Sequence, residues 1–377
     1  MSTALDNVCT LAPALDHQNE AFSSGFSVLR EAVQQGAFAA ASCAVTHRDR
    51  LVALKSFGRL TYDADSAQAT PATLFDLASV TKVVATTTMA MILYERDLLE
   101  LDAPIAGTVP EFLADSCGEP DSRRREVTFR MLLAHCSGLP AYEKLFLKAH
   151  SRDELLRAAF TTSLSTDPGT HSEYSDIGFI LLGAALERIA NESLDAFCQR
   201  EIFGPLSLIN TSFNPPADAR REIPPTADDR IFRKKIIQGE VQDENAFVLG
   251  GVAGHAGLFS TAGDLTCFAH AMLHGGRPIL HPETVALFTH RESTPRGTSR
   301  ALGWDTPSVP SQSGKYFGPN SFGHLGYTGT SLWIDPERQL SIALLTNRTW
   351  PDGASQAIKK VRPKVHDAIV EALIKLA

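Results

Sequence analysis

The stretch FDLASVTKVVATTTMAMILYERDLLELDAPI, residues 75–105, places Lys82 one helical turn after Ser79, where an apolar helix begins. A lysine at a buried helix start is costly unless something uses it. At this spacing on a helix the two side chains share one face, with Cβ atoms roughly 5–6 Å apart. A serine hydroxyl needs a base to become a nucleophile, and a lysine whose pKa is lowered by desolvation can be that base. The alternative is a serine cap followed by a lysine whose charge reaches solvent.

Two later stretches bear on this choice. The turn Glu173-Tyr174-Ser175-Asp176 directly precedes an apolar helix and can direct a phenol and a short polar group into a cleft. The alternative there is a helix cap by Ser175 or Asp176. The segment FGHLGYTGT, residues 322–330, is strand-like with closely spaced glycines. Glycine in a strand often marks the close approach of a ligand or another backbone, although a bulged edge strand has the same pattern.

The composition is that of a globular protein with a large core. The chain has 377 residues, of which 44% are hydrophobic and 21% charged, and its formal net charge is −8. This balance disfavours nucleic acid and anionic membrane surfaces as partners, and a small-molecule substrate is expected instead. No apolar run reaches the ~18 residues of a membrane span. Residues 1–22 contain no secretory signal, and six scattered cysteines indicate reduced thiols, so a cytoplasmic location is expected.

Hydrophobic periodicity predicts helices and strands in a definite order. The runs AAASCAVTH and LVALKSFGRL, separated by a charged turn, indicate a hairpin. Strand-like texture returns late in the chain at ALGW, SFGHLGY, TSLWIDP and QLSIALLTNR. The expected helices are 17–36, 80–96, those near TFRMLLAHC, RDELLRAAF, IGFILLGAALERIA and DLTCFAHAMLHG, and 355–376. Residues 223–264, rich in Gly, Pro and Asp, are expected to form loops.

Strands and helices at both ends of the chain bracket a helical middle. This order predicts an α/β (α+β) fold, in which an antiparallel sheet is flanked by N- and C-terminal helices and a helical domain is inserted. The predicted domains are a discontinuous α/β domain, residues 1–78 and 265–377, and a mostly helical domain, residues 79–264. The active site is expected between the two.

Three other features have competing interpretations. His270 and His274 lie four residues apart on one helix face, as metal ligands can, but no third ligand is evident, so no metal site is expected. Cys136 directly follows His135, and because sequence neighbours on a helix point apart, a structural thiol is favoured. His255 lies in a Gly-rich loop and is interpreted as structural. No Gly-x-Ser-x-Gly elbow is present, which disfavours an α/β-hydrolase.

Taken in order, these motifs resemble the serine β-lactamase and penicillin-binding-protein superfamily, in its class C-like branch, which also holds DD-peptidases and family VIII carboxylesterases. The stretches that carry the resemblance are LFDLASVTK, LLAHCSGLP, YSDIGFILLG, GEVQDENAFVLGGVAGHAGLFSTAGDL and GHLGYTGTSLWIDP. Class A enzymes use Ser-x-x-Lys, Ser-Asp-Asn and Lys-Thr-Gly, and the class C-like branch has a Tyr-Ser-Asn second motif. The resemblance implies a β-lactamase/transpeptidase-like fold and no cofactor.

The resemblance also implies roles for particular residues. Ser79 is the acylated nucleophile, and Lys82 and Tyr174 share the work of the base, with the pKa of the phenol depressed by nearby cationic groups. The oxyanion is expected between the backbone N–H groups of Ser79 and Tyr327. The implied enzyme is a serine hydrolase acting on a small ester or amide.

Two departures from the family pattern bear on the substrate. His324-Leu325-Gly326 stands where relatives that process β-lactams carry Lys-Thr-Gly, so a full positive charge and a hydroxyl are missing beside the substrate carboxylate. Asp176 stands in place of an asparagine that donates to the substrate amide, and an ionised carboxylate only accepts. Asp176, His324 and Gly326 are therefore expected to contact substrate. The pattern favours an esterase for short-chain or uncharged acyl groups; the alternatives are a β-lactamase, a DD-peptidase or a non-catalytic ligand-binding relative.

Overall fold

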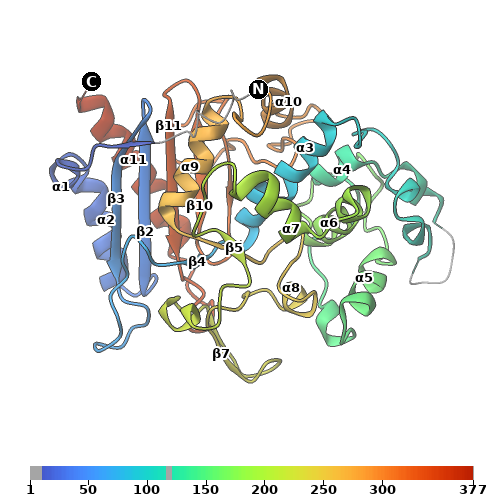
Figure 1. The fold of residues 1–377 in the computed structure, drawn as a ribbon, viewed down its shortest axis with the longest axis horizontal. Coiled ribbons are helices and arrows are strands. Elements are labelled where there is room, and N and C mark those ends of the chain that lie inside the picture. Colours follow the sequence, from blue (N-terminus) through green and yellow to red (C-terminus); the bar gives the residue numbers. More distant parts are fainter. Residues whose placement is uncertain (1–10, 116–120, 377) are drawn as a thin grey trace, which may run out of the picture.

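The computed structural model describes residues 11–115 and 121–376. Its main sheet has six strands in the order β1-β3-β2-β11-β10-β9, and every pairing except that of β1 with β3 is antiparallel. The strands are β1 (Ala12–Pro13), β2 (Ala40–His47), β3 (Arg50–Gly58), β9 (Phe322–Leu325), β10 (Ser331–Asp335) and β11 (Leu340–Thr346). The sheet is therefore assembled from the two ends of the chain, as the sequence predicts (Figure 1).

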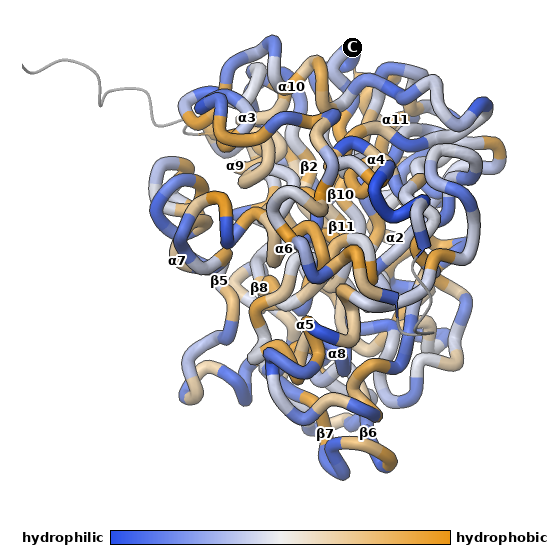
Figure 2. The backbone as a smooth tube through the Cα atoms, turned by 90° about the vertical axis from the view of Figure 1, so that its right-hand side faces the viewer, coloured by the Kyte–Doolittle hydropathy of each residue, from blue (hydrophilic) through white to orange (hydrophobic). Residues whose placement is uncertain are grey.

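Both faces of this sheet are covered. Successive side chains along each strand point to opposite faces, so each strand contributes to two cores. In β11, Ile342 and Leu344 pack with residues of α2 (Ser23–Gln34) and α11 (Ile358–Leu376). Ala343 and Leu345 point the other way, into the larger core that includes α9 (Ala262–Leu273). The hydrophobic colouring along β10 and β11 in Figure 2 agrees with this burial on both sides.

The helical middle of the chain packs beside the sheet (Figure 1). Its α-helices are α3 (Thr88–Glu95), α4 (Phe129–Leu133), α5 (Arg152–Phe160), α6 (Asp176–Ala190), α7 (Leu194–Cys198) and α8 (Glu244–Val248). The short helix α1 (Gln18–Ala21) precedes α2, and α10 (Pro282–Thr289) follows α9. Whether the middle forms a domain separate from the sheet stays a prediction.

The structure differs from the sequence-based expectation in three places. The helix expected over 80–96 is a 3₁₀ turn, Ala78–Val80, then a π-helix, Lys82–Thr87, and only then α3. Residues 223–264 are not only loop, since they contain β6 (Ala227–Asp229), β7 (Lys235–Ile237), α8 and β8 (Leu258–Ser260). ALGW forms no strand, because Gly303 takes a positive φ of 81° and turns the chain.

Two small sheets accompany the main one, and the first of them leads into the region around Ser79. Strand β8 pairs with β4 (Phe75–Asp76), which leads directly into the serine turn, and with β5 (Ser212–Phe213). Strands β6 and β7 form a hairpin that projects from the body of the molecule (Figures 1 and 2).

The described residues bear on the expectations about free thiols and membrane spans. Cys43, Cys136 and Cys198 are buried free thiols, whereas Cys9 and Cys117 lie outside the described residues, as do residues 1–10 of the segment searched for a signal. Across 11–115 and 121–376, every helix is too short or too polar to cross a bilayer.

Candidate active site

Ser79 lies in a strained turn between β4 and the π-helix. Ala78, the residue before it, has φ 47°, a left-handed conformation that is uncommon for a residue with a side chain. The turn is held because the Ala78 N–H donates to Asp76 Oδ1 at 2.8 Å, while the Gln242 N–H donates to the other oxygen of that carboxylate. Strain of this kind persists only where the surroundings enforce it, and it concentrates at functional sites. The turn leaves Ser79 partly exposed in a cleft.

The end of β9 fixes the same turn from the opposite side. Thr328 Oγ1 donates to Asp76 O at 2.8 Å, and Thr330 Oγ1 donates to Leu77 O at 2.9 Å. Gly326 lies so close that a Cβ there would overlap both Thr330 Oγ1 and Leu77 O. The glycine of the third motif is thus required by the close approach of two backbones, as its position in the sequence indicated.

Lys82 is fully buried, and three groups surround its amine. Nζ lies 3.1 Å from Ser79 Oγ, 2.6 Å from Asp176 Oδ1 and 2.9 Å from the His255 carbonyl oxygen. Desolvation lowers the pKa of Lys82, and the negative charge of Asp176 acts in the opposite direction without overcoming it. The predicted pairing of Ser79 with Lys82 is therefore present in space, and the lysine side chain does not reach solvent.

Asp176 is brought to Lys82 by the start of α6. The Ser175 side chain caps this helix by accepting from the Gly178 N–H at 2.9 Å, and Asp176 is the first helical residue. The cap predicted for Ser175 as an alternative role is present together with the cleft-facing Tyr174 and Asp176. The carboxylate expected to contact substrate lies 2.6 Å from Lys82 Nζ and also lines the cleft. Its contact with substrate stays a prediction.

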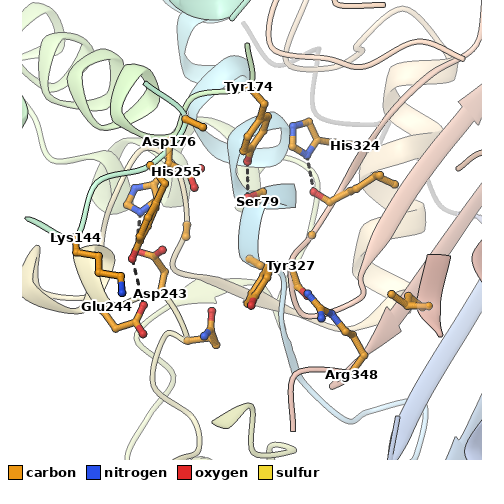
Figure 3. A pocket seen from close by; sticks show the side chains of 18 of the residues that line it. Ser79, Lys144, Tyr174, Asp176, Asp243, Glu244, His255, His324, Tyr327 and Arg348 are labelled. Atoms are coloured by element: carbon orange, nitrogen blue, oxygen red, sulfur yellow. Dashed lines mark hydrogen bonds and ion pairs between the residues drawn. The ribbon is translucent and has the colours of Figure 1, made fainter. Parts of the chain in front are cut away.

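Tyr174 points its hydroxyl at Ser79 (Figure 3). The phenol donates to Ser79 Oγ at 2.6 Å, and its ring centroid is 4.7 Å from that of His135 and 4.8 Å from Lys82 Nζ. Burial and, to a smaller extent, the charge of Asp176 raise the pKa of Tyr174 well above its ordinary value. The expectation that nearby cations lower this pKa is wrong, because the desolvation of the phenol has a larger effect than the positive charges. The free site therefore holds a neutral phenol.

The third motif offers neither charge nor hydroxyl beside Ser79. His324 is 2% exposed, and its Nδ1 lies 2.8 Å from the Leu325 carbonyl oxygen. Burial and the charge of Lys82 hold the pKa of His324 well below its ordinary value, so the ring is neutral near pH 7. Tyr327 is more than half exposed and its ring lies 4.3 Å from the Arg348 guanidinium carbon. In Figure 3 it lies across Ser79 from Tyr174. The role of its N–H in binding an oxyanion stays a prediction.

His255 contributes in a way that sequence reasoning missed. Its imidazole is buried, with Nε2 2.8 Å from Asp243 Oδ1, while its backbone carbonyl accepts from Lys82. A backbone carbonyl carries no residue-type signal, so no motif could have indicated this contact. Burial raises the pKa of the Cys136 thiol to about 11, in agreement with the structural role predicted for it.

The cleft has a volume of about 810 Å³ and both apolar and charged walls. Its apolar side chains include Tyr142, Phe146, Leu147, Ile231 and Phe232. Arg300, which the sequence did not single out, also lines it. Its guanidinium carbon lies 5.5 Å from the Tyr174 ring centroid, and its Nη1 lies 3.7 Å from Asp305 Oδ2. The cleft can therefore enclose an apolar acyl group and present one cation near Tyr174.

Comparisons with known proteins agree with this geometry. The family model described as Beta-lactamase matches residues 27–362. The putative D-alanyl-D-alanine carboxypeptidase of Escherichia coli (strain K12) is 32% identical over 331 residues, 81% of this chain and 76% of that protein. The N-acetylmuramyl-L-alanine amidase of Bacillus subtilis (strain 168) is 32% identical over 303 residues, 73% of this chain and 68% of that protein.

Two solved structures have a similar fold. EstCE1, a hydrolase with promiscuous acyltransferase activity, has a TM-score of 0.74 at 20% identity, covering 93% of this chain and 99% of its own. A class C beta lactamase from Rhodobacter sphaeroides has a TM-score of 0.71 at 21% identity, covering 93% of this chain and 99% of its own. These likenesses confirm the predicted fold class.

Proposed function

This chain belongs to the beta-lactamase family of serine hydrolases, and on that premise we propose that it hydrolyses esters of uncharged acyl groups through an acyl-enzyme on Ser79. The observation that carries the proposal is the set of three contacts at Lys82 Nζ. Two of the three neighbours, the Asp176 carboxylate and the His255 carbonyl, are acceptors. The third, the Ser79 hydroxyl, can donate.

A neutral amine satisfies these contacts completely. Its two N–H bonds serve Asp176 and His255 O, and its lone pair then faces the Ser79 hydroxyl. When Ser79 attacks an ester carbonyl, its proton passes to Lys82, and the resulting ammonium keeps both acceptors while its third N–H faces Ser79 Oγ. The buried position that lowers the pKa of Lys82 thus suits it to general-base work.

Tyr174 acts from the other side of the serine oxygen. As a neutral phenol that donates to Ser79 Oγ, it lies where it can protonate the departing alkoxide, and the Lys82 ammonium then restores the phenolic proton. The backbone N–H groups of Ser79 and Tyr327 are proposed to bind the oxyanion. The same groups run in reverse order when water hydrolyses the acyl-enzyme.

The walls of the cleft support the choice of an uncharged acyl group. His324 is buried and neutral, and Leu325 has no hydroxyl, so the third motif provides no partner for a carboxylate. Phe146 and Ile231 provide apolar surface within the same cleft. A charge-assisted hydrogen bond is worth roughly 1.5–3 kcal/mol. Without one, β-lactam turnover is expected to be on the order of ten- to a hundredfold poorer in kcat/KM.

The test uses p-nitrophenyl acetate and butyrate beside a chromogenic cephalosporin. Wild-type protein is expected to hydrolyse the esters, and Ser79→Ala to abolish this while keeping the circular dichroism spectrum, because the lost hydroxyl leaves little void. Ser165→Ala, which changes an exposed serine, is the matched control. A fluorophosphonate should give a single adduct on Ser79 by mass spectrometry. Labelling at another serine, or full activity of Ser79→Ala, would contradict the proposal.

Arg300 supports a second candidate, a carboxypeptidase for peptides ending in D-alanine. Its guanidinium lies over the Tyr174 ring within the cleft, where it could bind a substrate carboxylate through paired hydrogen bonds. The E. coli relative is named for this activity. If this candidate holds, Arg300→Gln lowers kcat/KM for an acyl-D-Ala-D-Ala peptide about ten- to a hundredfold and spares p-nitrophenyl esters. Equal effects on both substrates, or no peptide turnover by wild type, would exclude it.

A further inference from the structure

Outside the cleft, two imidazoles and a carboxylate meet at the end of α9. We propose that Asp49, His270 and His274 bind a divalent transition-metal ion, for which Zn²⁺ is the natural probe. The His270–His274 pair was set aside on sequence because no third ligand was evident. The fold supplies that ligand from the β2–β3 hairpin, more than 200 positions away in the chain.

The fold brings the three side chains together through two separate elements. Helix α9 packs against β2 and β11, and near its end His270 and His274 lie one turn apart, edge to face, with ring centroids 4.4 Å apart. The hairpin turns through Arg48 and Asp49, whose φ values are 47° and 63°. This turn sets Asp49 Oδ1 2.8 Å from His274 Nε2. One ligand atom from each of the three side chains lies within 4.8 Å of the other two.

This donor set suits zinc. Zn²⁺ binds imidazole nitrogen and carboxylate oxygen at about 2.0–2.2 Å in a tetrahedral arrangement, which puts ligand atoms about 3.4 Å apart. Closing from the observed separations needs only small side-chain rotations. Asp49 and His274 can make them, because their side chains are 61% and 42% exposed, while His270 is buried and fixed. Water would complete the coordination on the exposed side.

The state of His270 distinguishes this cluster from an ordinary hydrogen-bonded pair of side chains on the surface. It is 5% exposed, yet its Nδ1 is buried without a hydrogen-bond partner. Buried polar atoms are normally paired, and an unpaired one calls for an explanation such as an ion. Arg48 and Arg50 flank Asp49 in sequence, and their positive charges repel a cation. The Asp49 carboxylate therefore needs both imidazoles beside it to bind a metal ion. None of the three ligands lines the cleft. The ion would therefore tie the hairpin to α9 without entering the reaction.

The experiment is a calorimetric titration of tag-free, chelator-treated protein with ZnCl₂, repeated with Co²⁺ to read the ligand field from its visible spectrum. Wild type should bind one ion per chain with a tetrahedral Co²⁺ spectrum. Asp49→Asn and His274→Gln, both at exposed positions, should each weaken Zn²⁺ binding at least ~10-fold. Even the loss of a residue that only orients a metal ligand typically weakens metal binding by this factor. Hydrolytic activity of both variants should match that of wild type.

His281→Gln is the matched control. His281 also faces a carboxylate, with Nδ1 3.3 Å from Glu95 Oε2, but it lies outside the three-residue cluster. This variant should bind Zn²⁺ as wild type does. The proposal is overturned if wild type shows no saturable binding of one ion. It is equally overturned if Asp49→Asn and His274→Gln bind as tightly as wild type, which would put the ion elsewhere.

Discussion

Asp176 is one of the residues at which this site departs from its family's pattern. The sequence shows a carboxylate where relatives carry an amide, and from that change alone a contact with substrate was expected. The fold adds what the sequence could not, namely that the carboxylate lies 2.6 Å from the buried amine of Lys82. The predicted trio of Ser79, Lys82 and Tyr174 does meet in space. The raised pKa of the phenol was missed because burial depends on residues distant in the chain.

Lys82→Arg tests the lysine as base. Arginine keeps the positive charge but does not lose its proton, so the single-turnover acylation rate with p-nitrophenyl acetate should fall by at least ~10². Lys144→Arg, at an exposed lysine that lines the same cleft, should react at the wild-type rate. A near-normal rate for Lys82→Arg would move the role of base to another group.

Asp176→Asn tests the electrostatic coupling. The Asp176 charge raises the pKa of Lys82, so removing it should lower that pKa further. Because the neutral amine is the active form, the acidic limb of the kcat/KM profile should move to lower pH by about one unit or more. Glu244→Gln, which removes a different carboxylate from the cleft wall, should leave the limb in place. A limb that moves to higher pH would mean that Lys82 does not govern it.

Strand β9 and the serine turn act as one element, because hydroxyls after β9 bond to the backbone of residues 76 and 77. The sequence predicted β9, the glycine-rich segment that follows it and the helical nature of the segment after Ser79. It did not predict the π-helix at Lys82–Thr87, since a single π-helical turn within a helix carries no residue pattern of its own. The short strands within 223–264 were also missed, because three-residue strands carry no periodic pattern.

Gly326→Ala tests this contact between backbones. The added methyl would overlap Leu77 O, which cannot move without shifting Ser79, so both activity and stability should suffer. We expect a loss of about 1–3 kcal/mol in the free energy of unfolding, typical of overpacking, and a clear fall in kcat/KM. Gly107→Ala, where a Cβ meets open space, should change stability by less than ~0.5 kcal/mol. Wild-type behaviour of Gly326→Ala would refute the contact.

Across the whole molecule, the interior holds several imidazoles that are neutral in the folded state. Burial lowers the pKa of His135 and His324 well below the ordinary value, and lowers that of His366 to about 3. Below pH 6.5 the unfolded chain binds protons at these sites and the folded chain does not. Their contribution to stability is therefore complete above pH 6.5 and is lost as the pH falls toward the folded pKa values. No sequence pattern foretold this, because each ring is buried by distant segments.

His366→Gln isolates one of these rings. Each pH unit should cost wild type about 1.4 kcal/mol per buried imidazole, so the slope of unfolding free energy between pH 6.5 and pH 5 should be smaller by that amount in the variant. Urea titrations at several pH values measure the difference. Asp76, whose pKa is raised to about 6, contributes with the opposite sign but equally in both proteins. His290→Gln, at an exposed ring, should keep the wild-type slope.

The way in which both chain ends build one sheet has a consequence during synthesis. The Ala40 N–H bonds to the Asn347 side chain, 307 residues later, and β11 covers the inner edge of β2. Until residues 340–346 leave the ribosome, the β2–β3 hairpin exposes an unpaired apolar edge, which is a template for wrong pairing between chains. Contacts of such sequence separation also form slowly. The yield of native protein in cells should therefore depend on preventing contact between nascent chains. Slower translation at low temperature should raise that yield.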